Sequence, residues 1–208
     1  MIEFGYLIYL LICGGLILIL GAWHALSKDA KELIVLGPRS SGKTLWLCFL
    51  RNVKYMPGGT FDKESFPSFT FKKKNGDTIK IKSGYDYGGQ EENIKAYYEQ
   101  AICTKTKKAV MFFFSLYSYL NDCSYKRDVI ARLGFIENKF GSQLGKNNFY
   151  LVISYADKVS DSKDKAKKVT NELKQTYKLM DLLSKANIMV INATDKSNLE
   201  NLKNKMEI

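Results

Sequence analysis

The sequence predicts a mixed α/β domain: a doubly wound, mostly parallel sheet with one antiparallel edge strand, preceded by a single transmembrane helix. Three observations lead to this prediction. Short apolar runs alternate with helical patterns, a glycine-rich motif joins the first run to the first helix, and a long uncharged segment precedes both. We accordingly divide the 208 residues into an anchor at residues 1–26 and a domain at residues 27–208.

The composition is that of a globular protein. The chain is 46% hydrophobic and 25% charged, which excludes disorder as its main state and excludes a collagen-like repeat. Its four cysteines are widely spaced without a CxxC pair, so we expect reduced thiols and a cytosolic domain. A single histidine argues against a zinc or haem site built from several histidines.

The anchor is predicted at residues 4–23, which are 20 consecutive residues without a charge. Crossing a hydrocarbon core of about 30 Å takes roughly 20 apolar residues, and Trp23 closes the run as interfacial aromatic residues do. No lysine or arginine precedes the run, which disfavours a cleaved signal peptide. The lysines begin at Lys28, so the positive-inside rule predicts a single-pass protein with its N-terminus outside and its domain in the cytosol.

The first half of the domain is predicted from short patterns. Residues 32–36 (ELIVL) are a buried strand ending at a glycine, residues 43–53 a buried helix, and residues 54–65 a loop. Residues 68–74 and 78–82 alternate apolar and polar side chains around Asn-Gly-Asp, which is a strong hairpin signal.

The second half continues the alternation of helices and strands. Apolar runs predict strands at residues 109–115, 149–154 and 187–192. Helical spacing predicts helices at residues 91–103, 125–140 and 163–185, and a short closing helix that carries Leu199, Leu202 and Met206. Because strands alternate with helices except at the hairpin, the sheet should be parallel with helices on both faces.

The glycine-rich motif lies between the first predicted strand and the first predicted helix. Residues 37–44 read GPRSSGKT and fit GxxxxGK[ST] in the strand–loop–helix context that this phosphate-binding motif requires. Backbone N–H groups at the helix N-terminus would cradle phosphates, Lys43 would reach the β- and γ-phosphates, and Thr44 would ligate Mg²⁺. The candidate nucleotide-binding residues of this P-loop are Gly37, Arg39, Ser40, Ser41, Gly42, Lys43 and Thr44.

A second segment, Asp86-Tyr-Gly-Gly89-Gln90, follows the predicted hairpin. An aspartate at a strand end can hold Mg²⁺ through water, which is the role expected of Asp86. The N–H of Gly89 can meet the γ-phosphate, and Gln90 can orient the attacking water as the catalytic residue.

These two motifs resemble those of the small GTPases of the Ras-like superfamily. The sequence DYGGQ is most similar to the ADP-ribosylation-factor branch, and an anchor directly before the phosphate loop resembles the beta subunit of the signal-recognition-particle receptor. The resemblance covers residues 32 to the C-terminus. It implies a Ras-like fold, GTP or GDP binding with Mg²⁺, and switch segments that move with the γ-phosphate.

The resemblance also implies residues that read the base. The family's Asn-Lys-x-Asp motif corresponds here to Ser154-Tyr155-Ala-Asp157, which keeps the aspartate that reads guanine and replaces its Asn and Lys. Tyr155 could cover the base by stacking. The family's final loop corresponds to Asn-Ala193-Thr194, where a backbone N–H meets the guanine oxygen.

Two further positions depart from the family pattern. The switch threonine that closes over Mg²⁺ is placed at Ser68 by its distance from Asp86, with Ser65 and Thr60 as alternatives. Arg39 occupies a position where many small GTPases have a small residue, so it either stabilises phosphate charge or crowds the attacking water.

Residues 27–208 carry 32 basic against 20 acidic residues, a net charge of +12. No aromatic RNA-binding motif or recognition-helix pattern accompanies the lysines, so we expect contact with anionic lipid headgroups and no specific nucleic acid. Together the patterns predict a membrane-anchored GTPase of slow intrinsic turnover, whose switch segments recruit a protein partner. Two alternatives are a nucleotide-bound docking module with little hydrolysis and a P-loop ATPase of relaxed base specificity.

Overall fold

The computed structural model describes residues 30–58, 60, 62–89, 94–103, 108–176 and 179–207. Across these ranges no helix is both long and apolar enough to cross a membrane. The predicted anchor at residues 1–26 and the predicted catalytic Gln90 lie outside the described residues, so both stay predictions.

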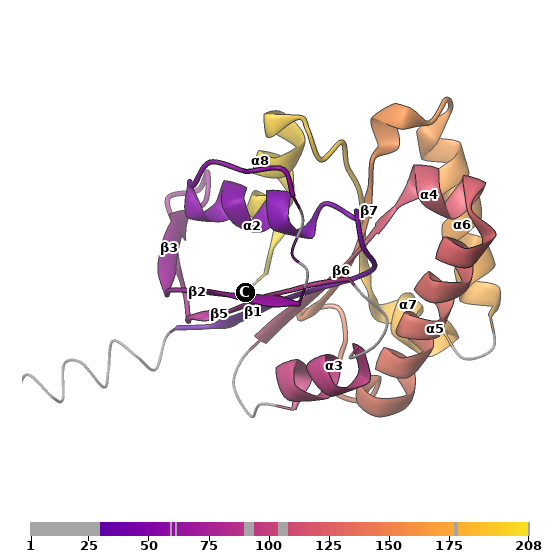
Figure 1. Ribbon diagram of the computed structural model, residues 1–208, viewed down its shortest axis with the longest axis horizontal. Helices are drawn as coiled ribbons and strands as arrows, with labels where there is room; N and C mark the ends of the chain where they lie inside the picture. The colour runs from indigo at the N-terminus through magenta and orange to yellow at the C-terminus, as the bar shows by residue number, and fades with distance from the viewer. Residues whose placement is uncertain are drawn as a thin grey trace, which may run out of the picture. The chain divides into compact units, whose positions relative to one another are not determined.

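The centre of the domain is a four-stranded parallel sheet (Figure 1). Its strands lie in the order β1 (Glu32–Leu36), β6 (Lys108–Ser115), β7 (Phe149–Ser154) and β8 (Asn187–Val190). The three longest strands are apolar at almost every position because helices cover both faces of the sheet. The predicted doubly wound arrangement is therefore confirmed.

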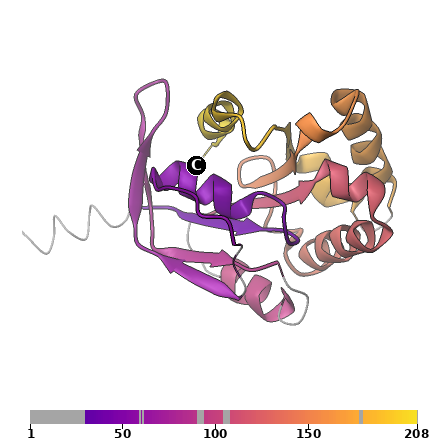
Figure 2. The same ribbon diagram turned by 45° about the horizontal axis from the view of Figure 1, so that its top comes forward.

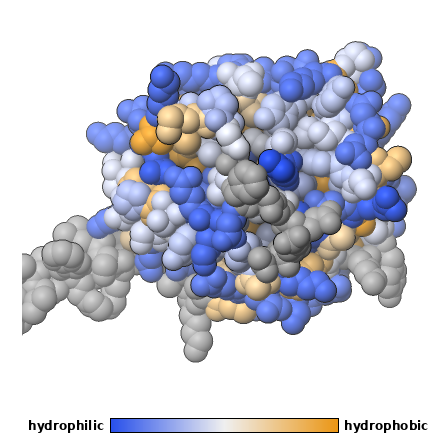
Figure 3. All heavy atoms as spheres, viewed as in Figure 1, coloured by the Kyte–Doolittle hydropathy of each residue, from blue (hydrophilic) through white to orange (hydrophobic). Residues whose placement is uncertain are grey.

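Alternate side chains of each strand enter two different cores, as the two-residue period of a strand requires. In β6, Phe112 and Phe114 face the core formed with α3 (Ile94–Ile102), α5 (Cys123–Phe140), α6 (Ser162–Gln175) and α7 (Met180–Lys185). Met111 and Phe113 face the core formed with α2 (Lys43–Arg51) and α8 (Lys196–Lys205). The visible surface is mostly hydrophilic, with scattered apolar side chains (Figure 3).

The hairpin is longer than the sequence predicts, and it rises beside α2 (Figure 2). Strands β2 (Lys63–Phe66) and β5 (Gly84–Tyr87) pair antiparallel, as do β3 (Phe69–Lys72) and β4 (Thr78–Ile81), in one common register. Pro67 lacks an N–H and interrupts the first arm. Residues 54–65, predicted as a loop, thus already contain the start of β2.

Among the described residues, one backbone bridge joins the hairpin to the parallel sheet. Lys31 forms a parallel bridge with Ile81, through hydrogen bonds of 2.9 Å to the backbone of Lys80 and Lys82. Beyond this bridge β5 runs beside β1 without forming a ladder with it. The prediction of one antiparallel edge strand in the sheet therefore needs correction. A hairpin of four strand segments takes its place.

Two helix predictions also need correction, and one helix was not predicted. The predicted helix at residues 163–185 is two helices, because Thr176 adopts an extended backbone that ends α6 before α7 begins. An additional helix, α4 (Leu116–Asn121), was not predicted; its first residue follows Ser115, whose side chain caps it. Helix α5 begins two residues earlier than predicted because the Asp122 side chain accepts bonds from its first N–H groups.

Candidate functional site

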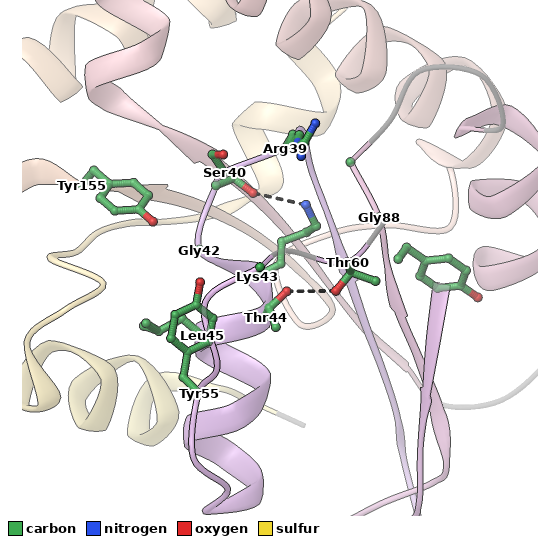
Figure 4. A pocket seen from close by; sticks show the side chains of 14 residues that line it. Arg39, Ser40, Gly42, Lys43, Thr44, Leu45, Tyr55, Thr60, Gly88 and Tyr155 are labelled. Carbon is green, nitrogen blue, oxygen red and sulfur yellow. Dashed lines mark hydrogen bonds between the residues drawn. The ribbon is translucent and has the colours of Figure 1, made fainter. Parts of the chain in front are cut away.

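The phosphate loop leaves the C-terminal end of β1 and leads directly into α2 (Figure 4). Gly37 has a φ of +136°, and a Cβ there would lie 2.0 Å from the carbonyl oxygen of Phe113. Gly42 has a φ of +90° and provides no side-chain cap for α2. The two motif glycines are thus required by backbone shape, and the first turn of α2 keeps its N–H groups for a ligand.

A cavity of about 320 Å³ opens at this loop. It is lined by the loop and by residues from three distant segments of the chain. The lining residues are Arg39, Ser40, Ser41, Gly42, Lys43, Thr44, Leu45, Tyr55, Gly58, Thr60, Tyr87, Gly88, Gly89 and Tyr155. The predicted phosphate-binding residues other than Gly37 are therefore gathered at one cavity.

Lys43 is buried at the base of this cavity, with 6% of its surface exposed. Its Nζ donates to the carbonyl oxygens of Gly37 at 2.9 Å and of Pro38 at 2.7 Å. Burial lowers the pKa of Lys43 from 10.5 to about 8, and the charge of Asp86 partly opposes this shift. A buried ammonium that donates to two backbone carbonyls is suited to receive an anion.

Three oxygen-bearing side chains meet beside Lys43. The hydroxyls of Thr44 and Thr60 donate to the same carboxylate oxygen of Asp86, at 2.7 and 2.9 Å, and lie 3.3 Å from each other. Figure 4 shows the two threonine side chains next to each other, with a dashed line between their hydroxyls. The other oxygen of Asp86 is buried and has no hydrogen-bond partner in the described residues.

This cluster fits a magnesium ion. Mg²⁺ prefers oxygen ligands and is usually held by one or two carboxylates, waters and phosphate oxygens. Asp86 supplies one carboxylate, and its buried oxygen, which has no hydrogen-bond partner among the described residues, is available to such a cation. Thr44 and Thr60 would complete the protein's contribution.

The structure does not bring Ser68 to this cluster. Ser68 lies exposed between β2 and β3, away from the cavity lining, and Ser65 lies exposed within β2. Thr60, an alternative in the sequence analysis, takes the place assigned to Ser68. The estimate by distance passed over Thr60 because it did not include β2, which begins only three residues after Thr60.

Gly89 packs directly on the phosphate loop and is buried. A Cβ on Gly89 would lie 2.2 Å from the backbone nitrogen of Arg39, so only glycine fits there. Its neighbour Gly88 donates its N–H to the carbonyl of Asp62 at 2.5 Å. Arg39 itself is exposed and also lines the cavity.

The opposite end of the cavity is aromatic. Tyr155 has a left-handed backbone with a φ of +55° and a half-buried ring, and Tyr55 lines the same cavity. Burial raises the pKa of Tyr155, with a smaller contribution from neighbouring Tyr55. The ammonium of Lys158 lies 4.7 Å from the centre of the Tyr155 ring. Two tyrosines thus line this end of the cavity, and a cation lies close to one of them.

The predicted base-reading residues are only partly assembled. Ser154 is buried, and its hydroxyl lies 2.8 Å from the carbonyl of Ser41, so it ties the base motif to the phosphate loop. Ala193 is buried beside Gly42. Thr194 is exposed and hydrogen-bonds to Asn192. Asp157 is exposed on a short 3-10 helix and is not part of the cavity lining.

No protein-family profile matches the sequence, and no curated protein matches it. Among solved structures, the chain is similar to a bacterial selenocysteine-specific elongation factor, EF-Sec, with a TM-score of 0.56 and 16% sequence identity. The match covers 86% of this chain and 28% of that one, so this chain spans less than a third of the length of the elongation factor. At this identity the likeness concerns the fold alone, which in the described residues is mixed α/β with a mostly parallel central sheet.

Proposed function

We propose that the chain is a guanine-nucleotide-binding switch that binds GTP and GDP with Mg²⁺. One observation carries the proposal: Thr44, Thr60 and Asp86, from three separate segments, meet beside the buried Lys43 at a phosphate loop. A structural ion pair or a simple turn would not need two hydroxyls on one carboxylate oxygen, with no hydrogen bond to the other oxygen from any residue that the structure describes.

The chain's own residues would bind the nucleotide in three ways. Lys43 would exchange the carbonyls of Gly37 and Pro38 for phosphate oxygens, while N–H groups of the loop and of α2 surround the same phosphates. When bound, Mg²⁺ would neutralise charge on the β- and γ-phosphates. Thr44, Thr60 and Asp86 would hold the ion, and Thr60 would connect it to the segment between α2 and β2.

Hydrolysis by this chain is proposed to be slow. Gln90 directly follows the buried Gly89, which is the position from which it could orient an attacking water. Arg39 already lines the cavity from the loop, and in this position we favour crowding of the water over stabilisation of the phosphates. An arginine supplied to the transition state is worth roughly 10³–10⁵ in rate for such enzymes, and a partner would have to provide it.

The base is proposed to lie between the rings of Tyr55 and Tyr155, with the ammonium of Lys158 close to the Tyr155 ring. Asp157 would provide the preference for guanine once a base draws the short 3-10 helix inward. A second candidate is a P-loop NTPase of relaxed base specificity that also accepts ATP. The exposed position of Asp157 favours this candidate, because stacking on tyrosines does not distinguish one purine from another.

The membrane anchor remains part of the proposal. Residues 1–26 would hold the domain at the cytosolic face, where a protein partner reads the segments around Thr60 and Gly89. A docking module that keeps its nucleotide and hydrolyses little would have the same site, so turnover separates it from a switch.

Nucleotide binding to the full chain, purified in detergent, tests the proposal. We expect GTP and GDP to bind in the presence of Mg²⁺, ATP to bind much more weakly, and Lys43→Ala to abolish binding of all three. Asp157→Ala should relax the preference for guanine. Equal competition by ATP in the unmutated protein would replace the GTPase assignment by the relaxed-specificity candidate, and failure of every nucleotide to bind would refute both.

A further inference from the structure

We propose that Arg132 is a positioning residue that holds Gly89 against the phosphate loop from α5 and thereby sets the preference for GTP over GDP. The inference rests on the proposed function, because it assigns a regulatory role to the glycine of that same site. Arg132 lies 43 residues from Gly89 in the chain and belongs to none of the sequence motifs.

Arg132 is buried to an unusual degree for a cation, with 2% of its surface exposed. Its Nη2 donates to the carbonyl oxygen of Gly89 at 2.8 Å, and its Nε donates to the carboxylate of Asp128 at 2.7 Å. A buried charge is costly unless it is paired and hydrogen-bonded. Asp128, one turn earlier on α5, compensates the charge, and the Gly89 carbonyl receives the directed bond.

The same arginine also borders the start of the phosphate loop. Tyr98 of α3 is buried, and its hydroxyl accepts a hydrogen bond from the N–H of Gly37 at 3.2 Å. Burial raises the pKa of Tyr98, and the neighbouring charge of Arg132 opposes that shift. Arg132 therefore lies between the first residue of the loop and the end of the Asp86–Gly89 segment.

Gly89 is thus held from two sides. Its Cα rests on the backbone of Pro38 and Arg39, and Arg132 binds its carbonyl from α5. This second contact fixes the peptide group that leads from Gly89 to Gln90. Asp128 on the same helix and Tyr98 on α3 both interact with the guanidinium, so the group that binds Gly89 is itself held in place.

The consequence for nucleotides follows from where the phosphates would lie. A γ-phosphate would meet the N–H of Gly89, whereas GDP does not extend that far. A pre-positioned Gly89 therefore favours GTP, because the ordering of the segment is already accomplished before binding. Removing Arg132 would release Gly89 and would weaken GTP binding while leaving the GDP contacts intact.

The test compares affinities for GDP and for a non-hydrolysable GTP analogue, both with Mg²⁺, in the full chain. Because hydrogen bonds from a charged group are involved, Arg132→Met should weaken analogue binding by roughly 10- to 100-fold and GDP binding by less than about threefold. Arg132→Lys, which keeps the charge, should restore part of the difference. Arg127→Met, at an exposed arginine of the same helix, should change neither affinity.

If Arg132→Met weakens the binding of both nucleotides equally, or changes neither affinity, the inference is overturned and Arg132 is a purely structural residue. Hydrogen exchange in the unmutated protein gives a second readout that needs no variant. Residues 86–89 and the middle of α5 should gain protection together when the analogue replaces GDP, and independent behaviour would count against the coupling.

Two different measurements test the proposed function and the role of Arg132: nucleotide binding tests the first, and hydrogen exchange without nucleotide tests the second. If the unmutated protein binds no guanine nucleotide, the proposed function fails. Arg132→Met should still accelerate hydrogen exchange at residues 86–89 in the nucleotide-free protein, because the bond to Gly89 is present there. Unchanged exchange in that variant would overturn the positioning role, whatever the nucleotide result.

Discussion

Two threonines at the site have different origins. Thr44 belongs to the phosphate-loop motif, whereas Thr60 reaches Asp86 from a segment without a motif of its own. Ser68, which the sequence favoured for this role, is exposed on the hairpin. A hydroxyl is a candidate metal ligand only if it lies close to the other ligand oxygens. Thr60 lies close to Asp86, and its position depends on where β2 begins.

Thr60→Val removes one hydroxyl from this cluster and nearly preserves side-chain shape. We expect it to weaken Mg²⁺-dependent GTP binding by roughly tenfold or more, the effect of losing one bond to a charged group. Ser68→Ala is the matched control and should leave GTP affinity unchanged. Titrations of GTP at several Mg²⁺ concentrations measure both, and a larger effect of Ser68→Ala would reverse the assignment.

Lys43 makes nucleotide binding sensitive to pH. Burial lowers its pKa to about 8, and bound phosphate would raise the pKa again because it favours the protonated amine. Below about pH 8 the amine is already charged, so affinity should be constant there. Above that, binding must take up a proton, and affinity should fall by about tenfold at pH 9.

Calorimetry in two buffers with different ionisation enthalpies measures this proton uptake directly. Uptake should be close to zero at pH 7 and should increase toward pH 9. Constant uptake across this range would contradict a lowered pKa for Lys43.

Helix α5 is the element that links the site to the rest of the domain. Its start is set by Asp122, whose side chain accepts hydrogen bonds from the N–H groups of Ser124 and Tyr125 at 2.8 and 3.1 Å. Farther along, its buried face carries Val129, Leu133 and Ile136 into the larger core, and Arg132 toward Gly89. The position of Arg132 thus depends on the whole helix being in place.

Loss of this cap should destabilise the domain. Asp122→Ala should lower the free energy of unfolding by about 1 kcal/mol, the usual cost of removing an N-cap side chain. Asp122→Asn should cost much less, because asparagine caps helices about as well as aspartate. Chemical denaturation of the three proteins measures the difference, and equal stability of the alanine variant would show that the cap contributes little.

At the scale of the whole domain, the two faces of the parallel sheet pack into two separate cores. The face covered by α3, α5, α6 and α7 holds the larger core, and the face covered by α2 and α8 holds the other. The cavity lies at the carboxyl ends of β1, β7 and β5, the last strand of the hairpin. Residues at or just after these strand ends line it. Ligand sites of open α/β sheets are usually found at this edge.

The uncharged run before the domain predicts where the full chain is found in cells. We expect the full chain to be recovered with membranes and to require detergent, while a chain that begins at Ser27 stays soluble and binds GTP. Fractionation followed by detergent and carbonate extraction measures this. Recovery of the full chain in the soluble fraction would refute the anchor.

The sequence by itself determined the features that short segments encode. The phosphate loop between β1 and α2, the apolar parallel strands and the turn at Asn75-Gly76 are set by local backbone geometry and by burial on both faces of a sheet. Only the tertiary structure decided which hydroxyl meets Asp86, that Asp157 is exposed, and that Arg132 binds Gly89. These contacts join residues far apart in the chain, and they depend on strand register and helix placement, which arise from the packing of the whole domain.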